Sequence, residues 1–246
     1  MFKVLDLFSG IGGFSLGLER TGMFETVAFC EIDPFCRKVL TKHWPTVPIF
    51  EDVRKLKGED VGDATVICGG FPCQDISKAG NGAGLEGARS GLWTEMLRLI
   101  DEIRPVWVIA ENVCAMRVNG LARVLQDLWT VGYDAEWHVI PACGVGAAHR
   151  RERVWIIANP NRGGRETPWL TEGVAEMARR ESHQQLQTAE PSSVAGWAGR
   201  VSCPGMGRIV DDVPDRVDRL AALGNTVVPQ IPELIGRAIG FTANAV

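Results

Sequence analysis

The sequence predicts a doubly wound α/β fold with a mostly parallel sheet and a small, irregular second domain or insert. Over residues 1–158, short β-branched or apolar runs alternate with helical patterns, which indicates βαβ units and a parallel sheet covered on both faces. After Ala158 the chain becomes rich in Gly, Pro, Ser, Gln and Arg, a composition typical of loops and short elements. The length of 246 residues suits one α/β domain with a small appendage.

The expected elements follow in chain order. Strands are predicted at 4–8, 26–33, 48–53, 64–70, 106–113, 136–142 and 153–158, and helices at 12–22, 34–44, 92–103 and 121–132. Pro34 stands in the first turn of its helix after Asp33, which can cap it, and Gly22 and Gly132 stand where helices should stop. Helical patterns return at 216–224 and 229–240.

Three segments are therefore expected. Residues 1–158 form the core that carries the site, residues 159–208 form a small separate region, and residues 209–246 return to the core. The third assignment rests on the apolar helical spacing of the last two segments, which needs a sheet face to cover.

Composition and charge exclude several classes of protein. Hydrophobic residues make up 46% and charged residues 23%, which is typical of a soluble globular protein. The sequence contains no apolar run near 18 residues and opens without signal-peptide features, so a cytoplasmic protein without a membrane partner is expected. The seven cysteines form no C-x-x-C pair, and most of them, including Cys30, Cys68, Cys114 and Cys143, are expected to be buried and reduced. A net charge of −4 restricts any nucleic-acid contact to local patches, such as the five arginines between residues 142 and 165.

The first strand–helix junction reads DLFSGIGGFSLG. Its glycines allow a tight turn beside a ligand, and Glu31, at the end of the second strand, is placed to bind a ribose diol. A nucleotide-like ligand is indicated, although a purely structural turn stays open at this point. The G-x-G-G spacing and the absence of G-K-[ST] weaken both the dinucleotide-binding and the P-loop interpretations.

Two further strand ends carry reactive residue types. Cys73 follows Pro72 just past an apolar strand, where a cysteine can be a nucleophile, and the glycine-rich segment after it has the composition of a lid. Glu111 and Asn112 end another apolar strand, so a raised pKa would let Glu111 donate a proton. By itself each position also fits a structural role, as an inert cysteine or a helix cap.

Together these motifs resemble the cytosine-5 DNA methyltransferase family. DLFSGIGG, the acid at 31, FEDV, GGFPCQ, ARSGLW, ENV, RRERVWIIA and GNTVVPQ occur in the family's order. The resemblance covers about residues 1–158 and 216–240 and implies a Rossmann-like methyltransferase core of bacterial or phage type. Because eight motifs occur in the family's order, the interpretation of each motif as a purely structural feature is no longer favoured.

The resemblance implies a pocket for S-adenosylmethionine, with S-adenosylhomocysteine as product and no metal. Within it, Glu31 would bind the ribose hydroxyls, and Asp52 with Val53 would contact the adenine. The full set of positions implied or assigned to this cofactor is Asp6, Phe8, Gly10, Gly12, Glu31, Ile32, Asp52, Val53, Leu92, Asn225 and Thr226.

The resemblance also implies the catalytic residues. Cys73 matches the nucleophile that attacks C6 of a flipped cytosine, and Glu111 matches the residue that faces N3. Arg151 and Arg153 match the basic pair near the base and its phosphates. Where the family usually has Pro-Gln before this pair, the chain has Ala148 and His149, which bears on substrate positioning.

The implied partner is double-stranded DNA, with residues 159–208 as a small target-recognition region. A cognate restriction endonuclease that acts separately is a possible second partner. Three alternatives stay open at this point. They are a tRNA cytosine-5 methyltransferase, a catalytically silent DNA-binding relative and, least favoured, a nicotinamide-dependent oxidoreductase.

Overall fold

The computed structural model describes residues 1–72, 91–147, 149–160 and 222–243. Within these ranges a seven-stranded sheet has the order β3-β2-β1-β4-β5-β7-β6. The strands are β1 (Phe2–Leu7), β2 (Phe24–Cys30), β3 (Ile49–Phe50), β4 (Val66–Gly70), β5 (Trp107–Val113), β6 (Tyr133–Pro141) and β7 (Glu152–Pro160). The helices are α1 (Gly13–Glu19), α2 (Pro34–His43), α3 (Gly91–Ile103), α4 (Met116–Asn119), α5 (Leu121–Thr130) and α9 (Gln230–Ala243), with 3₁₀ turns η1 (Gly58–Val61) and η4 (Ala142–Val145).

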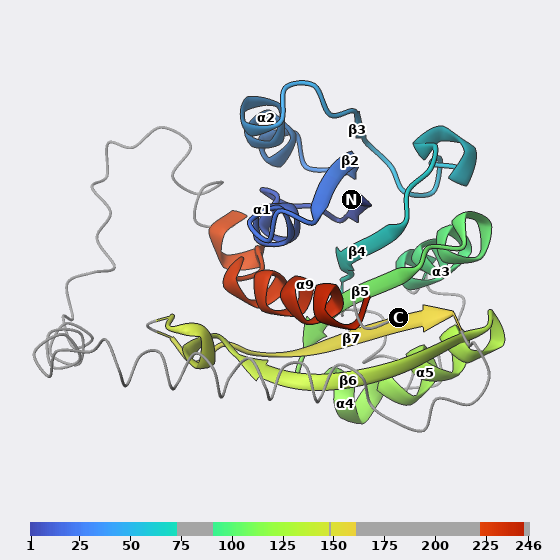
Figure 1. Cartoon of the computed structure of the whole chain (residues 1–246), viewed down its shortest axis with the longest axis vertical. Coiled ribbons are helices and arrows are strands. Elements are labelled where there is room, and N and C mark those ends of the chain that lie inside the picture. Colours follow the sequence, from blue (N-terminus) through green and yellow to red (C-terminus); the bar gives the residue numbers. More distant parts are fainter. Residues whose placement is uncertain (73–90, 148, 161–221, 244–246) are drawn as a thin grey trace, which may run out of the picture.

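The predicted α/β fold with a mostly parallel sheet is confirmed. β3, β2, β1, β4 and β5 pair in parallel, which requires the crossover helices that the sequence pattern indicates. β7 pairs antiparallel with both β5 and β6, so it enters the sheet between them (Figure 1). The last two strands therefore form an antiparallel edge on a parallel sheet.

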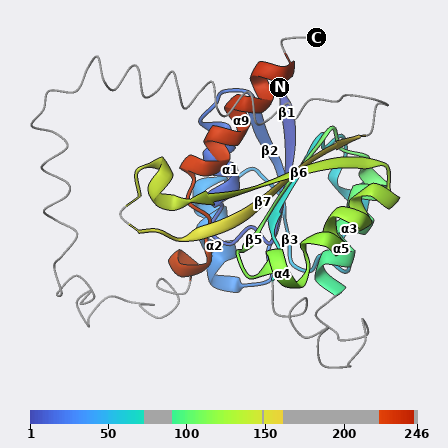
Figure 2. The ribbon, with the colours of Figure 1, turned by 90° about the horizontal axis from the view of Figure 1, so that it is seen from below.

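Each face of the sheet carries its own hydrophobic core. On one face Leu5, Ile67, Val108 and other strand residues pack with α3 and α5. On the opposite face Val4, Ile109 and neighbouring strand residues pack with α1 and α9. Figure 2 shows the two helix layers with the sheet between them. Successive strand residues point to opposite faces, which explains why fully buried strands read as continuous apolar runs.

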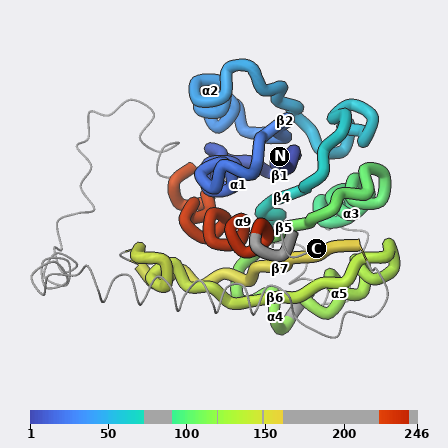
Figure 3. Tube along the Cα trace, in the orientation of Figure 1, coloured from blue at the N-terminus to red at the C-terminus, as the bar shows by residue number. Residues whose placement is uncertain are grey.

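The last helix packs beside the first. α9 packs against α1, and Figure 3 shows the two segments side by side despite their separation in sequence. Two glycines permit this approach: a Cβ on Gly17 would stand 2.1 Å from the carbonyl oxygen of Pro229, and one on Gly236 would stand 3.1 Å from Leu18. The C-terminal segment is thus integral to the described structure.

Local signals also appear as expected. Asp33 caps α2 by accepting from the backbone N–H groups of Phe35 (2.8 Å) and Cys36 (3.0 Å). Gly22 and Gly132 follow helices with positive φ angles of 73° and 84°.

Some expectations fall outside the described residues. These are Cys73 and the glycine-rich segment after it, most of the region at 159–208, and the start of the helical pattern at 216–224. β7 ends at Pro160, which pairs with Tyr133, rather than at the expected Ala158.

The expectation for the cysteines is confirmed at Cys30 and Cys68, which are buried and free, and is wrong at Cys143, which is exposed because its 3₁₀ turn leaves the sheet. Cys114 is half-buried. Within the described part of the chain, no helix has the length and apolar character needed to cross a membrane.

Candidate active site

A cavity of about 730 Å³ opens at the carboxyl ends of the parallel strands. Ligands of open α/β sheets bind at this edge, where the loops after the strands diverge. Residues after β1, β2, β3 and β4 line it, together with the last three residues of β5, the start of β7 and the segment 222–227 that precedes α9. The cavity therefore joins parts of the chain that are far apart in sequence.

The glycine loop after β1 forms one wall. Gly10 has a positive φ of 54°, and its backbone N–H donates to Oε2 of Glu31 at 2.7 Å. A Cβ built on Gly10 would meet no atom within 4 Å, so its open side leaves room for a ligand. The loop thus presents bare backbone to the cavity, as a nucleotide-like ligand requires.

Glu31 is held at the end of β2 by backbone groups on both sides. Besides Gly10, the N–H of Asp33 donates to Oε1 of Glu31 at 2.8 Å, and Glu31 is only 8% exposed. Each carboxylate oxygen can accept a further hydrogen bond, and the two hydroxyl groups of a ribose can donate them.

Asp52 lies along the same wall in a bidentate ion pair with Arg54 (2.9 and 2.8 Å). Hydrogen bonds from Arg54 hold the pKa of Asp52 below its usual range, so this carboxylate stays ionised.

Asp6 and Gly12 lie behind the cavity wall rather than on it. Asp6 is fully buried and accepts from the hydroxyl (2.8 Å) and backbone N–H (3.3 Å) of Ser15, so it anchors the start of α1. Burial raises the pKa of Asp6 to about 8, against the effect of these hydrogen bonds. Gly12 takes a φ of 84°, and a Cβ there would stand 2.6 Å from the ring of Trp44. Both residues shape the glycine loop from the inside.

The opposite end of the cavity holds a buried acid paired with an arginine. Glu111 is 8% exposed, and its Oε1 lies 3.0 Å from Nε of Arg153. Burial raises the pKa of Glu111 to about 7, and the positive charges of Arg153 and Arg151 oppose this rise. The antiparallel pairing of β5 with β7 brings these side chains together, and the missing side chain of Gly70 leaves space for the carboxyl group. Near neutral pH this group can both donate and accept a proton.

Asn112 is a cavity residue absent from the predicted set of site residues. It is 2% exposed, its amide donates to the carbonyl of Phe71 at 2.9 Å, and its Oδ1 accepts from the N–H of Val113 at 2.8 Å. The first of these bonds holds Phe71, which directly follows β4 and stands two residues before Cys73. Its position at the carboxyl end of an apolar strand was the available signal, because ligands of open α/β sheets bind where the parallel strands end.

The cavity brings together most of the predicted site residues. Those that line it are Phe8, Gly10, Glu31, Ile32, Asp52, Val53, Leu92, Glu111, Arg151, Arg153, Asn225 and Thr226. Asp6 and Gly12 do not line it, and Cys73 lies outside the described residues, directly after the lining residue Pro72.

A family model described as C-5 cytosine-specific DNA methylase matches residues 2–197, about four fifths of the sequence. The chain belongs to this family. The predicted resemblance to cytosine-5 DNA methyltransferases is thereby confirmed.

Curated relatives of this chain include named bacterial enzymes. Type II methyltransferase M2.BsuMI of Bacillus subtilis is 37% identical over 165 residues, which cover 64% of this chain and 42% of the relative. Type II methyltransferase M.Bsp6I of a Bacillus species is 35% identical over 167 residues, covering 65% and 53%. The chain spans about half the length of the curated relatives it matches.

Solved structures of other proteins share the fold. A prophage-encoded protein of E. coli described as a DNA modification methyltransferase matches with a TM-score of 0.56 and 27% identity, covering 65% of this chain and 47% of that one. The S. pombe Dnmt2 methyltransferase matches with a TM-score of 0.61 and 20% identity, covering 72% and 56%, and at this identity it supports the fold alone.

Proposed function

We propose that this C-5 cytosine-specific DNA methylase transfers a methyl group from S-adenosylmethionine to C5 of a flipped cytosine in DNA. The observation that carries the proposal is the Glu111–Arg153 pair at one end of a cavity whose other end holds Glu31. Activation of a pyrimidine base needs a proton donor and a cation at one end of the cavity. Binding of a nucleoside cofactor needs a carboxylate beside an exposed backbone loop at the other end. Both requirements are met within one cavity.

The residues present fit the cofactor. The open side of Gly10 and the backbone-held carboxylate of Glu31 suit an adenosine, with the ribose hydroxyls donating to Glu31. Val53 and Leu92 add apolar lining, and Asn225 adds polar groups. When bound, the cofactor supplies an electrophilic methyl group on a sulfonium centre.

The protein residues would activate the base. The Cys73 thiolate forms a bond to C6 of cytosine, and the electron pair of the C5–C6 double bond moves into the ring towards N3. Glu111 gives its proton, or a hydrogen bond, to N3, and Arg153 keeps the carboxyl group in place and stabilises the added charge. C5 is then nucleophilic enough to accept the methyl group. A base takes the C5 proton, the electron pair of the C5–H bond restores the C5–C6 double bond, and the bond from C6 to the Cys73 sulfur breaks. N3 returns its proton to Glu111.

The base must leave the duplex to reach this site. The target atom inside a stacked duplex is inaccessible to groups at the bottom of a cavity, so the nucleotide has to rotate into it. We infer double-stranded DNA as the substrate from the family match and from the relatives' description as type II methyltransferases. A partner endonuclease that acts separately fits the same description.

Bisulfite sequencing of plasmid from cells that express the protein tests the proposal. Methylated cytosines in a defined sequence context are expected for the wild type and absent for Cys73→Ala. DNA with 5-fluorocytosine at the target should form a covalent adduct, because fluorine cannot leave as a proton does. Unmarked plasmid combined with methylated tRNA in the same cells would replace DNA by tRNA as the substrate. Full methylation by the alanine variant would refute the covalent mechanism.

A further inference from the structure

Arg151 contacts the chain far from its own strand. Its Nη1 donates to the carbonyl of Gly224 at 2.5 Å and its Nη2 donates to the carbonyl of Thr226 at 3.0 Å. The two acceptors flank Asn225, and Asn225 and Thr226 both line the cavity. One guanidinium therefore spans a segment of the cavity wall that is more than 70 residues away in sequence.

The same segment is confined on its other side by the glycine face of α1. A Cβ on Gly13 would stand 2.6 Å from Oγ1 of Thr226 and 2.8 Å from the carbonyl oxygen of Val227. The segment overlaps the end of a helical turn at 222–225, in which the N–H of Thr226 donates to the carbonyl of Ala222 at 3.0 Å, and the chain then continues into α9. It thus lies between close-packed backbone on one side and the guanidinium of Arg151 on the other.

Arg151 and Arg153 serve different partners. Arg153 lies at 3.0 Å from the Glu111 carboxylate at the base end, whereas the fork of Arg151 is directed at two backbone carbonyls. Arg151 also has a positive φ of 22°, which a residue with a side chain adopts when its surroundings hold it there. A planar fork with several N–H donors can bridge two acceptors at fixed spacing, which an ammonium group cannot do equally well.

We propose that Arg151 is a positioning residue that holds the Gly224–Thr226 segment against the cavity and so sets the affinity for S-adenosylmethionine. It does so by fixing backbone carbonyls and therefore acts through Asn225 and Thr226. The proposal divides the basic pair: Arg153 serves the base through Glu111, and Arg151 serves the cofactor. It rests on the proposed function for the identity of the ligand, and the contact itself stands independently of that function.

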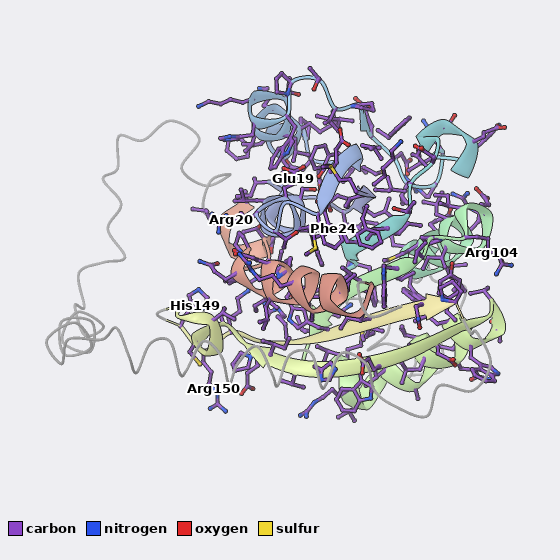
Figure 4. The ribbon with its side chains drawn as sticks, in the orientation of Figure 1. Glu19, Arg20, Phe24, Arg104, His149 and Arg150 are labelled. Carbon is purple, nitrogen blue, oxygen red and sulfur yellow. The ribbon has the colours of Figure 1, made fainter. Side chains whose placement is uncertain are left out.

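Hydrogen exchange without ligand tests the contact. In Arg151→Met, the backbone N–H of Thr226 should exchange at least tenfold faster than in the wild type, because the segment loses its two anchoring donors. Arg150→Met is the matched control. Arg150 lies at the outer tip of the β6–β7 connection (Figure 4), its side chain is 81% exposed, and it pairs with Glu152. Equal exchange at Thr226 in both variants would overturn the proposal.

Calorimetry with S-adenosylhomocysteine tests the consequence. The dissociation constant should rise at least tenfold in Arg151→Met. In Arg151→Lys, which keeps the positive charge but loses the planar guanidinium, it should also rise, by a smaller factor. It should stay unchanged in Arg150→Met. A lysine variant with wild-type affinity and exchange would overturn the bridging role. If the methionine variant does not fold, the lysine variant decides. A wild type that fails to bind the ligand would refute the proposed function, while the exchange experiment would still decide the contact.

Discussion

Replacing Glu111 by Gln should change how stability depends on pH. Burial raises the pKa of this carboxyl from an ordinary value of 4.5 to about 7. The unfolded chain therefore releases the proton near pH 4.5, and the folded protein keeps it until about pH 7. Because the native state binds the extra proton throughout this window, the wild type loses stability as pH rises through it. The difference between the two pKa values corresponds to about 3 kcal/mol of unfolding free energy.

Urea unfolding of wild type and Glu111→Gln at pH 5 and pH 8.5 measures this effect. The glutamine does not titrate, so the variant should gain about 2–3 kcal/mol relative to the wild type between these pH values. Other carboxyl groups, such as Asp6, titrate in both proteins and cancel in the difference. Glu51→Gln, at a side chain that is 72% exposed, controls for the loss of a carboxylate from the cavity rim. If the stability difference between wild type and Glu111→Gln changes by less than about 0.5 kcal/mol between the two pH values, the argument from burial is refuted.

Three further predictions can be checked by chemical denaturation. Gly17→Ala would place a Cβ 2.1 Å from the carbonyl oxygen of Pro229 and push α9 away, costing about 1–3 kcal/mol. Gly91→Ala, whose Cβ would meet nothing within 4 Å, should be neutral or stabilising; equal losses in both would contradict the close approach. Asp33→Ala removes two hydrogen bonds at the start of α2 and should cost about 1 kcal/mol, an unchanged midpoint counting against the cap. Asn112→Ala leaves the buried carbonyl of Phe71 without its donor and should lower the free energy of unfolding by about 1–3 kcal/mol. A loss of only a few tenths of a kcal/mol, as at an exposed position, would contradict this.

The order of strands and helices could be predicted from the sequence because each depends on local signals. Apolar runs mark buried strands, a 3.6-residue period marks helices, and Asp33 with Pro34 marks a helix start within a few residues. The location of the site at the carboxyl edge follows from the parallel sheet alone, since the ends of parallel strands share one edge. Glu31 and Glu111 are placed in one cavity for this reason.

Only the tertiary structure decided which of these residues face the cavity and which partners hold them. Asp6 and Glu31 are both acids at strand ends, yet Asp6 turns inward to Ser15 while Glu31 lines the cavity. β7 enters the sheet between β5 and β6, and the register opposes Arg153 to Val113, two residues from Glu111, which lets Arg153 reach the Glu111 carboxylate. The sequence by itself determined the elements and the chemistry they carry, because periodicity and capping act over a few residues. Partners such as Arg151 and the carbonyl of Gly224 depend on strand register and helix packing, which link segments with no local signal for each other.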